Sequence, residues 1–201
     1  MEKVRVAIIG LGCRGGYMLQ NCLLDMDNMV VTAVCDTYQD RVDWAVDAIV
    51  GRGFEKPFAS TDWHEVLDPA IADAVLILSS WESHVPIAIE AMEKGIAVGM
   101  EVGGAYSIDQ CWDMVRTYER TKTPFMFLEN CCYGRIEMMV MNMIKQGLFG
   151  EIVHCSGMYG HDLRSQVAGG LQERHYRYRN YLHRCTENYR RAKYKHNYRY
   201  D

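Results

Sequence analysis

The 201-residue sequence contains no run of about 18 apolar residues, the length that a helix needs to cross a bilayer. Its first residues lead directly into the apolar run 4–9, which leaves no room for the charged segment, apolar segment and cleavage site of a secretory signal. The composition, 49% hydrophobic and 24% charged, is typical of a globular domain with its own core. We therefore expect a soluble, cytoplasmic protein with no membrane partner.

The eight cysteines show no CxxC spacing and no regular framework. In a chain of this size without a signal peptide, they are expected to be reduced and mostly buried. The adjacent Cys131 and Cys132 suggest metal or redox chemistry, but no second pair of ligands stands at a spacing typical of zinc sites. The sequence therefore predicts no metal site.

Short β-rich runs alternate with amphipathic stretches over the first 129 residues, a pattern that predicts an α/β fold: a Rossmann-type parallel sheet with helices on both faces. Strands are expected at 4–9, 30–35, 73–78, 97–100 and 125–128. Helices are expected at 14–24, 39–51, 85–94 and 108–121, the last capped by Ser107. On the second helix, Trp44, Ala45, Ala48 and Ile49 have the spacing of core residues.

A different pattern begins near Asn130. A methionine-rich helix is expected from Ile136 to Gln146, followed by a strand from Glu151 to Met158. Residues 130–189 are therefore interpreted as an incomplete α+β substrate domain, and residues 190–201 as a basic tail without apolar periodicity.

Gly10, Gly12 and Gly15 form a GxGxxG motif that follows an apolar strand and opens a helix, together with Cys13 and Arg14. In that context the glycines permit a tight turn, close approach of a diphosphate and packing of helix on strand, while the helix N-terminus supplies amide donors. Asp36 stands 21 residues after Gly15, at the end of the next strand, where a carboxylate binds the adenosine ribose and repels a 2′-phosphate. The motif predicts NAD in preference to NADP.

Largely polar sets of residues also follow three later strands. They are Trp81, Glu82, Ser83 and His84 after the third strand, Glu101 and Val102 after the fourth, and Asn130 after the fifth. Ligands of open α/β sheets bind beyond the carboxyl ends of the strands, so these residues are candidate cofactor contacts. The alternative interpretation is that Trp81 is a core aromatic and His84 caps the next helix.

These motifs, with the segments 128–135, 147–151 and 159–164, resemble the Gfo/Idh/MocA oxidoreductases over roughly residues 4–189. Within that family the sequence is more similar to the NAD-dependent α-N-acetylgalactosaminidase-like branch, glycoside hydrolase family 109. The resemblance implies that NAD is contacted by Arg14, Gly15, Asp36, Trp81 to His84, Glu101, Val102 and Asn130. It also implies that Tyr159, Arg177 and Tyr189 contact a sugar, with His161 beside it as an acid–base group.

Many dehydrogenases of the family carry Glu-Lys-Pro where this chain has Glu101-Val102-Gly103, so their proton-transferring lysine is absent. This favours the glycosidase-like chemistry that the resemblance implies: oxidation at sugar C3, elimination, addition of water and re-reduction. That route does not need the carboxylate pair of ordinary glycosidases. The alternatives are a sugar or polyol dehydrogenase using NAD(P), and a dinucleotide-binding protein without catalytic activity.

The sequence departs from the family pattern after Tyr189, which suggests a truncated or frame-shifted product whose oligomeric state would depend on a complete second domain. Residues 174–201 carry nine Lys and Arg residues against Glu187 and Asp201. Arginine interleaved with tyrosine can bind single-stranded nucleic acid. However, much of this segment lies within the family-like region, so a small sugar or glycoside is the expected partner, and no nucleic acid.

Overall fold

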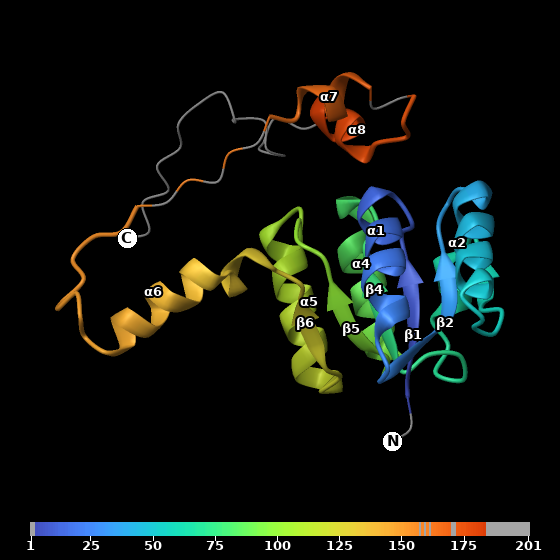
Figure 1. Cartoon of the computed structure of the whole chain (residues 1–201), viewed down its shortest axis with the longest axis horizontal. Coiled ribbons are helices and arrows are strands. Elements are labelled where there is room, and N and C mark those ends of the chain that lie inside the picture. The colour runs from blue at the N-terminus through green and yellow to red at the C-terminus, as the bar shows by residue number, and fades with distance from the viewer. Residues whose placement is uncertain (1–2, 157, 159, 161, 170–171, 184–201) are drawn as a thin grey trace. The chain divides into compact units, whose positions relative to one another are not determined.

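The computed structural model describes residues 3–156, 158, 160, 162–169 and 172–183. The chain divides into two units, 1–130 and 131–201, which are described separately. The first unit is built on a six-stranded, wholly parallel sheet in the order β3-β2-β1-β4-β5-β6 (Figure 1). Its strands are β1 (Val4–Ile9), β2 (Met29–Cys35), β3 (Phe58–Ser60), β4 (Ala74–Ile77), β5 (Ala97–Met100) and β6 (Phe125–Phe127).

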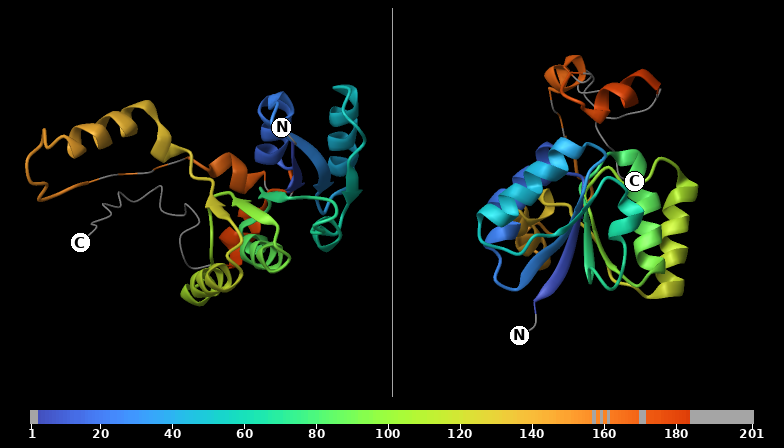
Figure 2. Two further views of the ribbon diagram at one scale, coloured as in Figure 1. Left: turned by 90° about the horizontal axis from the view of Figure 1, so that it is seen from below. Right: turned by 90° about the vertical axis from the view of Figure 1, so that its right-hand side faces the viewer.

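Helices cover both faces of this sheet (Figure 2, right). The helices of the first unit are α1 (Cys13–Asn21), the 3₁₀ helix η1 (Leu23–Asp25), α2 (Gln39–Gly51), α3 (Trp63–Val66), α4 (Trp81–Glu93) and α5 (Ile108–Thr121). On one face Val6 and Ile8 pack with Leu19 of α1 and Ile49 of α2. On the other face Ala7 and Ile9 pack with α3 and α4 and with Met114 of α5. Because a parallel sheet is buried on both sides, its strands are apolar at nearly every position.

The strand order reverses between β1 and β4, and this reversal positions the site. The connection after β1 leads toward β2, whereas the connection after β4 leads toward β5 on the opposite side. Open α/β sheets bind their ligands at such a reversal, beyond the carboxyl ends of the strands, which are β1 and β4 here.

The predicted α/β fold class is confirmed, and the bounds of β1, α2, β5 and α5 agree with those expected. Helix α4, however, begins at Trp81 and not at Val85. Pro86 therefore lies within the helix, where it has no amide hydrogen to donate to the Glu82 carbonyl. The core assignment of Trp44 was wrong: the buried stripe of α2 is Val42, Ala45 and Ile49, and Trp44 is exposed.

The cysteines among the described residues are free thiols. Contrary to the expectation, most of them are not buried. Only Cys35 among them is buried, and burial raises the pKa of its thiol to about 12. Cys13 lies at the start of α1 and Cys111 on α5, two positions open to solvent. Cys185 lies outside the described residues.

The second unit contains the 3₁₀ helix η2 (Cys131–Tyr133) and the helices α6 (Arg135–Lys145), α7 (Arg164–Ala168) and α8 (Tyr176–His183). Helix α6 agrees with the expected methionine-rich helix. The expected strand 151–158 was wrong, because its described residues, 151–156 and 158, are not in a strand. A strand requires a hydrogen-bonded neighbour, and the described part of this unit offers none. In the portions of the chain described, the structure has no helix of the length and apolar character needed to span a bilayer.

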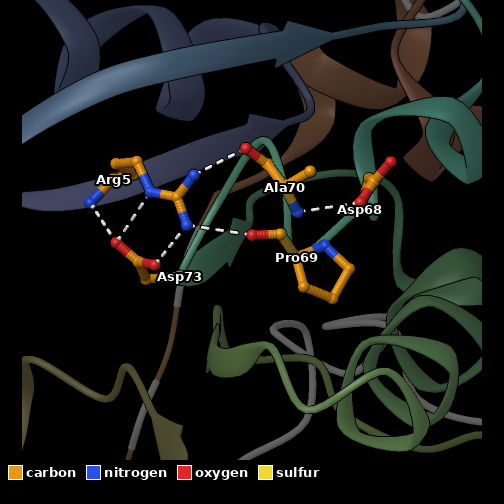
Figure 3. A network of polar contacts seen from close by, with 5 residues as sticks. All are labelled: Arg5, Asp68, Pro69, Ala70 and Asp73. Carbon is orange, nitrogen blue, oxygen red and sulfur yellow. Dashed lines mark hydrogen bonds and ion pairs between the residues drawn. The ribbon is translucent and has the colours of Figure 1, made fainter.

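A polar network joins β1 to the segment before β4 at the amino-terminal edge of the sheet (Figure 3). The guanidinium of Arg5 donates to Asp73 Oδ1 at 2.6 Å and to the carbonyls of Ala70 at 2.6 Å and Pro69 at 2.9 Å. The backbone amide of Arg5 donates to Asp73 Oδ2 at 2.9 Å. These bonds fix the turn that leads into β4. The side-chain hydrogen bond from Arg5, followed by that from its amide, holds the pKa of Asp73 below its ordinary value.

Replacement of Asp73 by Asn is expected to lower the free energy of unfolding at neutral pH by roughly 0.5 kcal/mol, since the pair is partly exposed. The folded-state pKa of Asp73 is lowered, so its contribution is complete above the unfolded pKa of about 3.9 and is lost as pH falls through the folded value. Urea unfolding across this range measures the difference between wild type and variant. Asp47→Asn, at an exposed position of α2, is the matched control. A difference that stays constant into acid would contradict the assignment.

Candidate dinucleotide-binding site

The segments that follow β1, β2, β4 and β5 are held side by side by backbone hydrogen bonds that continue the sheet. Gly10 N donates to the Cys35 carbonyl at 2.8 Å, and Leu78 N donates to the Ile9 carbonyl at 2.8 Å. Glu101 N donates to the Ile77 carbonyl at 2.9 Å. The glycine motif, Asp36, the Ser79–His84 segment and Glu101 therefore share one edge of the sheet, as the sequence predicted.

Each of the three glycines of the motif has a different role in the structure. Gly10 has a positive φ of 99°, and a Cβ there would overlap the backbone of Ser79. A Cβ on Gly15 would overlap the carbonyl oxygen of Gly10, so α1 can pack against the turn only with glycine at this position. At Gly12, in contrast, a Cβ would meet only the Arg41 guanidinium, at 3.5 Å. Gly10 and Gly15 thus shape the turn, and Gly12 keeps a space open in front of it.

The space at Gly12 lies at the N-terminus of α1, for which Gly12 is the N-cap. Glycine has no side chain to accept hydrogen bonds from the first-turn amides, and the first turn of α1 carries no acidic residue. The amides and the positive end of the helix dipole can therefore act on an anion. This cradle fits the diphosphate of a dinucleotide.

Asp36 is buried at the end of β2, the position expected for the ribose-binding carboxylate. Its Oδ2 accepts from Leu11 N at 2.7 Å, and its Oδ1 accepts from Tyr38 N at 3.1 Å. Asp36 therefore also holds the glycine turn against β2. Each carboxylate oxygen can accept more than one hydrogen bond, so these contacts leave capacity for ribose hydroxyls.

Tyr38 and Arg41 lie near Asp36, and the sequence analysis did not identify either of them as a site residue. Arg41 Nη1 lies 3.5 Å from Asp36 Oδ2, and its guanidinium lies over the Tyr38 ring, 4.8 Å from the ring centre. The guanidinium thus lies beside both the carboxylate and the space in front of Gly12. A cation in the first turn of the helix after Asp36 was a signal that could have identified it.

Trp81 and His84 lie in the first turn of α4, and both are buried. The ring of Trp81 packs beneath the loop after β5, where a Cβ on Gly103 would overlap its indole. His84 Nε2 lies 3.1 Å from the Ser79 carbonyl, so the ring nitrogen that donates is Nε2 and the ring does not cap the helix. Its Nδ1 is buried without a hydrogen-bond partner in the structure as described. Burial lowers the pKa of His84, which favours a neutral imidazole at pH 7.

Arg14 and Glu101, two predicted cofactor contacts from distant parts of the sequence, form an ion pair across this edge. Arg14 Nε lies 3.0 Å from Glu101 Oε2, and Glu101 Oε1 accepts from Val102 N at 3.2 Å. Asn130 follows the edge strand β6 and is exposed. The pair joins the first turn of α1 to the loop after β5.

The predicted sugar-binding residues belong to the second unit. Tyr159, His161 and Tyr189 lie outside the described residues. Arg177 is on α8, where its Nη1 donates to His175 Nε2 at 3.3 Å and its guanidinium lies over the Tyr176 ring. The structure therefore describes the residues that are predicted to contact the cofactor, whereas most of those predicted to contact the sugar lie outside the described residues.

Comparison with known proteins matches residues 4–128 to the oxidoreductase family model with an NAD-binding Rossmann fold. Residues 133–199 match the C-terminal domain of glycosyl hydrolase 109. The chain is 42% identical over 172 residues to an alpha-N-acetylgalactosaminidase of Shewanella oneidensis and to a glycosyl hydrolase family 109 protein of Shewanella sp. (strain MR-4). Each alignment covers 83% of this chain, which spans 37% of the length of these relatives.

Solved structures share the fold. Scyllo-inositol dehydrogenase from Lactobacillus casei, with bound NAD(H) and scyllo-inositol, has a TM-score of 0.66 at 21% identity, over 75% of this chain and 43% of that one. The WlbA dehydrogenase from Bordetella pertussis, in complex with NADH and UDP-GlcNAcA, has a TM-score of 0.65 at 22% identity, over 75% and 44%.

The different roles of Gly12 and Gly15 can be separated by alanine substitution. Gly12→Ala has room to fold, with a cost below about 1 kcal/mol, but its methyl group enters the phosphate cradle. We expect its affinity for NAD⁺ to fall by roughly tenfold or more, while its melting temperature changes little. Gly15→Ala is expected to lower the melting temperature strongly, because the methyl group overlaps the Gly10 carbonyl.

Calorimetric titration and thermal unfolding of each variant measure both effects. Gly51→Ala is the control: it lies at the end of α2, a Cβ there meets no atom within 4 Å, and neither quantity should fall. Binding by Gly12→Ala as tight as that of wild type would show that the cradle does not receive the dinucleotide.

Proposed function

Because the chain belongs to the Gfo/Idh/MocA oxidoreductase family and carries its NAD-binding Rossmann domain at residues 4–128, we propose that it takes part in NAD-dependent cleavage of a glycoside. The observation that carries this proposal is the loop after β5. The family's proton-transferring lysine is replaced there by Val102, and Gly103 packs on Trp81. A dehydrogenase that relies on that lysine is disfavoured. The similarity of residues 133–199 to the family 109 C-terminal domain supports the glycosidase branch.

The residues of the first unit suit the binding and orientation of the cofactor. The cradle at Gly12 and the first turn of α1 would hold the diphosphate, and Asp36 would accept from the adenosine ribose. Glu101 and the segment 81–84, beyond the ends of β5 and β4, would border the nicotinamide. Asn130, after β6, would contact the same end.

When bound, NAD⁺ supplies an acceptor for a hydride from sugar C3 and, as NADH, the donor that returns it. The C3 ketone acidifies the C2 proton, which a weak base can then remove as the bond from C1 to the leaving group breaks. Water adds at C1 of the resulting enone, and a proton returns to C2. Return of the hydride to C3 and of a proton to its oxygen leaves the free sugar, with no net oxidation.

His161 is the residue we assign to transfer of the C2 proton, and Tyr159 is the candidate partner at the C3 hydroxyl. Arg177 and Tyr189 would position the sugar. These assignments rest on the resemblance of their segments to the family and on the match of residues 133–199. A neutral imidazole or a phenolate can serve as base near pH 7 when its surroundings tune its pKa.

Hydrolysis of aryl glycosides in D₂O tests this chemistry. With NAD⁺ and an aryl N-acetyl-α-galactosaminide, the substrate class named for a relative, the free sugar should carry deuterium at C2, and NADH should not accumulate. His161→Asn is expected to lower turnover by roughly 10²- to 10⁴-fold and to leave NAD⁺ affinity unchanged.

Each contrary result has a distinct meaning. Aryl release without deuterium at C2 would indicate direct hydrolysis and contradict the elimination step. NADH accumulation without aryl release would identify a sugar or polyol dehydrogenase. Cofactor binding with neither product, across a panel of aryl glycosides, would leave a dinucleotide-binding protein without glycosidase activity.

A further inference from the structure

Helix α5 carries an apolar stripe on the side that faces away from the sheet. Its inner side packs through Met114 and the buried Thr117, next to α4. Its outer side presents Ile108, Trp112 and Val115, which are 76%, 54% and 43% exposed. These positions are spaced by four and three residues and therefore lie in one row along the helix. Cys111 and Tyr118, both exposed, border the row on one side.

The stripe does not belong to the dinucleotide site. Helix α5 is the last helix of its layer, beside the edge strand β6 (Figure 1). Its placement in the first unit is fixed by packing on α4 and by the ion pair of Arg120 with Glu93. An exposed row that includes tryptophan and tyrosine, the residue types enriched at interface centres, is typical of a protein–protein contact.

The charges beside the stripe are arranged so that they complement those of a second copy of the same helix. On the flank opposite Cys111 and Tyr118, Asp109 lies in the N-terminal half of the helix and Arg116 in the C-terminal half. Arg116 Nη1 lies 3.6 Å from Oδ1 of Asp113, a residue of the same flank, and both side chains are more than half exposed. In an antiparallel pair of helices related by a twofold axis, equal flanks meet and opposite halves of the helices are adjacent. Asp109 of each copy then faces Arg116 of the other.

We propose that this face of α5 is a self-association surface, at which two copies of the chain pack their α5 helices antiparallel about a twofold axis near Trp112. The twofold closes the contact, so the assembly is a dimer and does not extend to a filament. The two Trp112 side chains form its centre, Ile108 of one copy packs near Val115 of the other, and the two Cys111 thiols lie close to the axis. The proposal is independent of the glycosidase assignment.

Sedimentation velocity of the full 201-residue chain over a wide range of concentration tests the dimer. The wild type is expected to be dimeric at high concentration, and Trp112→Glu to weaken dimerisation by roughly tenfold or more. Val50→Glu, at an exposed apolar position of α2 on the other face of the sheet, is the matched control and should leave the dimer intact. A monomeric wild type, or a dimer unaffected by Trp112→Glu, would overturn the proposal.

Exchanging the charges of Asp109 and Arg116 distinguishes the specific antiparallel pairing from non-specific association of apolar surfaces. Asp109→Arg and Arg116→Asp should each weaken the dimer by roughly two- to tenfold, and the double variant should restore it. Circular dichroism and thermal unfolding of each variant verify that the helix is intact. Failure of the double variant to recover, with the fold unchanged, would exclude the antiparallel pairing.

Cross-linking gives an independent measure of the axis. A short bismaleimide, which joins two thiols by addition, should yield a covalent dimer through Cys111. That product should disappear in Cys111→Ser and persist in the control Cys155→Ser, another exposed thiol. Persistence of the same product in Cys111→Ser would place the contact elsewhere on the chain.

Discussion

A hydrogen bond of 2.7 Å from the Leu11 amide to the Asp36 carboxylate is the interaction on which the site depends. It joins the turn after β1 to the end of β2, and with it the positions of Gly12, α1 and Arg41 are set. The same carboxylate is the group that the ribose would meet. One side chain therefore shapes the phosphate cradle and recognises the nucleoside, which couples the architecture of the turn to the choice of cofactor.

Strand β1 is held at both of its ends by polar contacts, and this rigidity supports the site. At its amino end Arg5 bonds to Asp73 and to the carbonyls before β4; at its carboxyl end the glycine turn bonds to Cys35 and Asp36. Between them the strand is buried by helices on both faces. Because β1 lies at the reversal of strand order, fixing it also fixes the strand end beyond which a dinucleotide would bind.

The parts of the fold that depend on local pattern could be predicted from the sequence. The apolar runs, the glycine motif, Asp36 and the Ser107 cap lie where expected, because each is encoded within a few residues. Contacts between distant residues could not be foreseen: Arg5 with Asp73 and Arg14 with Glu101 lie 68 and 87 residues apart. The expected strand 151–158 was wrong because a strand depends on a neighbour that no local pattern supplies.

The measurement that tests the central claim most directly is calorimetric titration of the 201-residue chain with NAD⁺ and with NADP⁺, repeated on Asp36→Ala. A carboxylate at this position should favour NAD⁺ by roughly tenfold or more, about 1.4 kcal/mol, and its removal should weaken NAD⁺ binding. Wild-type binding of NADP⁺ as tight as that of NAD⁺, or an Asp36→Ala variant that binds NAD⁺ unchanged, would contradict the role assigned to the Asp36 carboxylate.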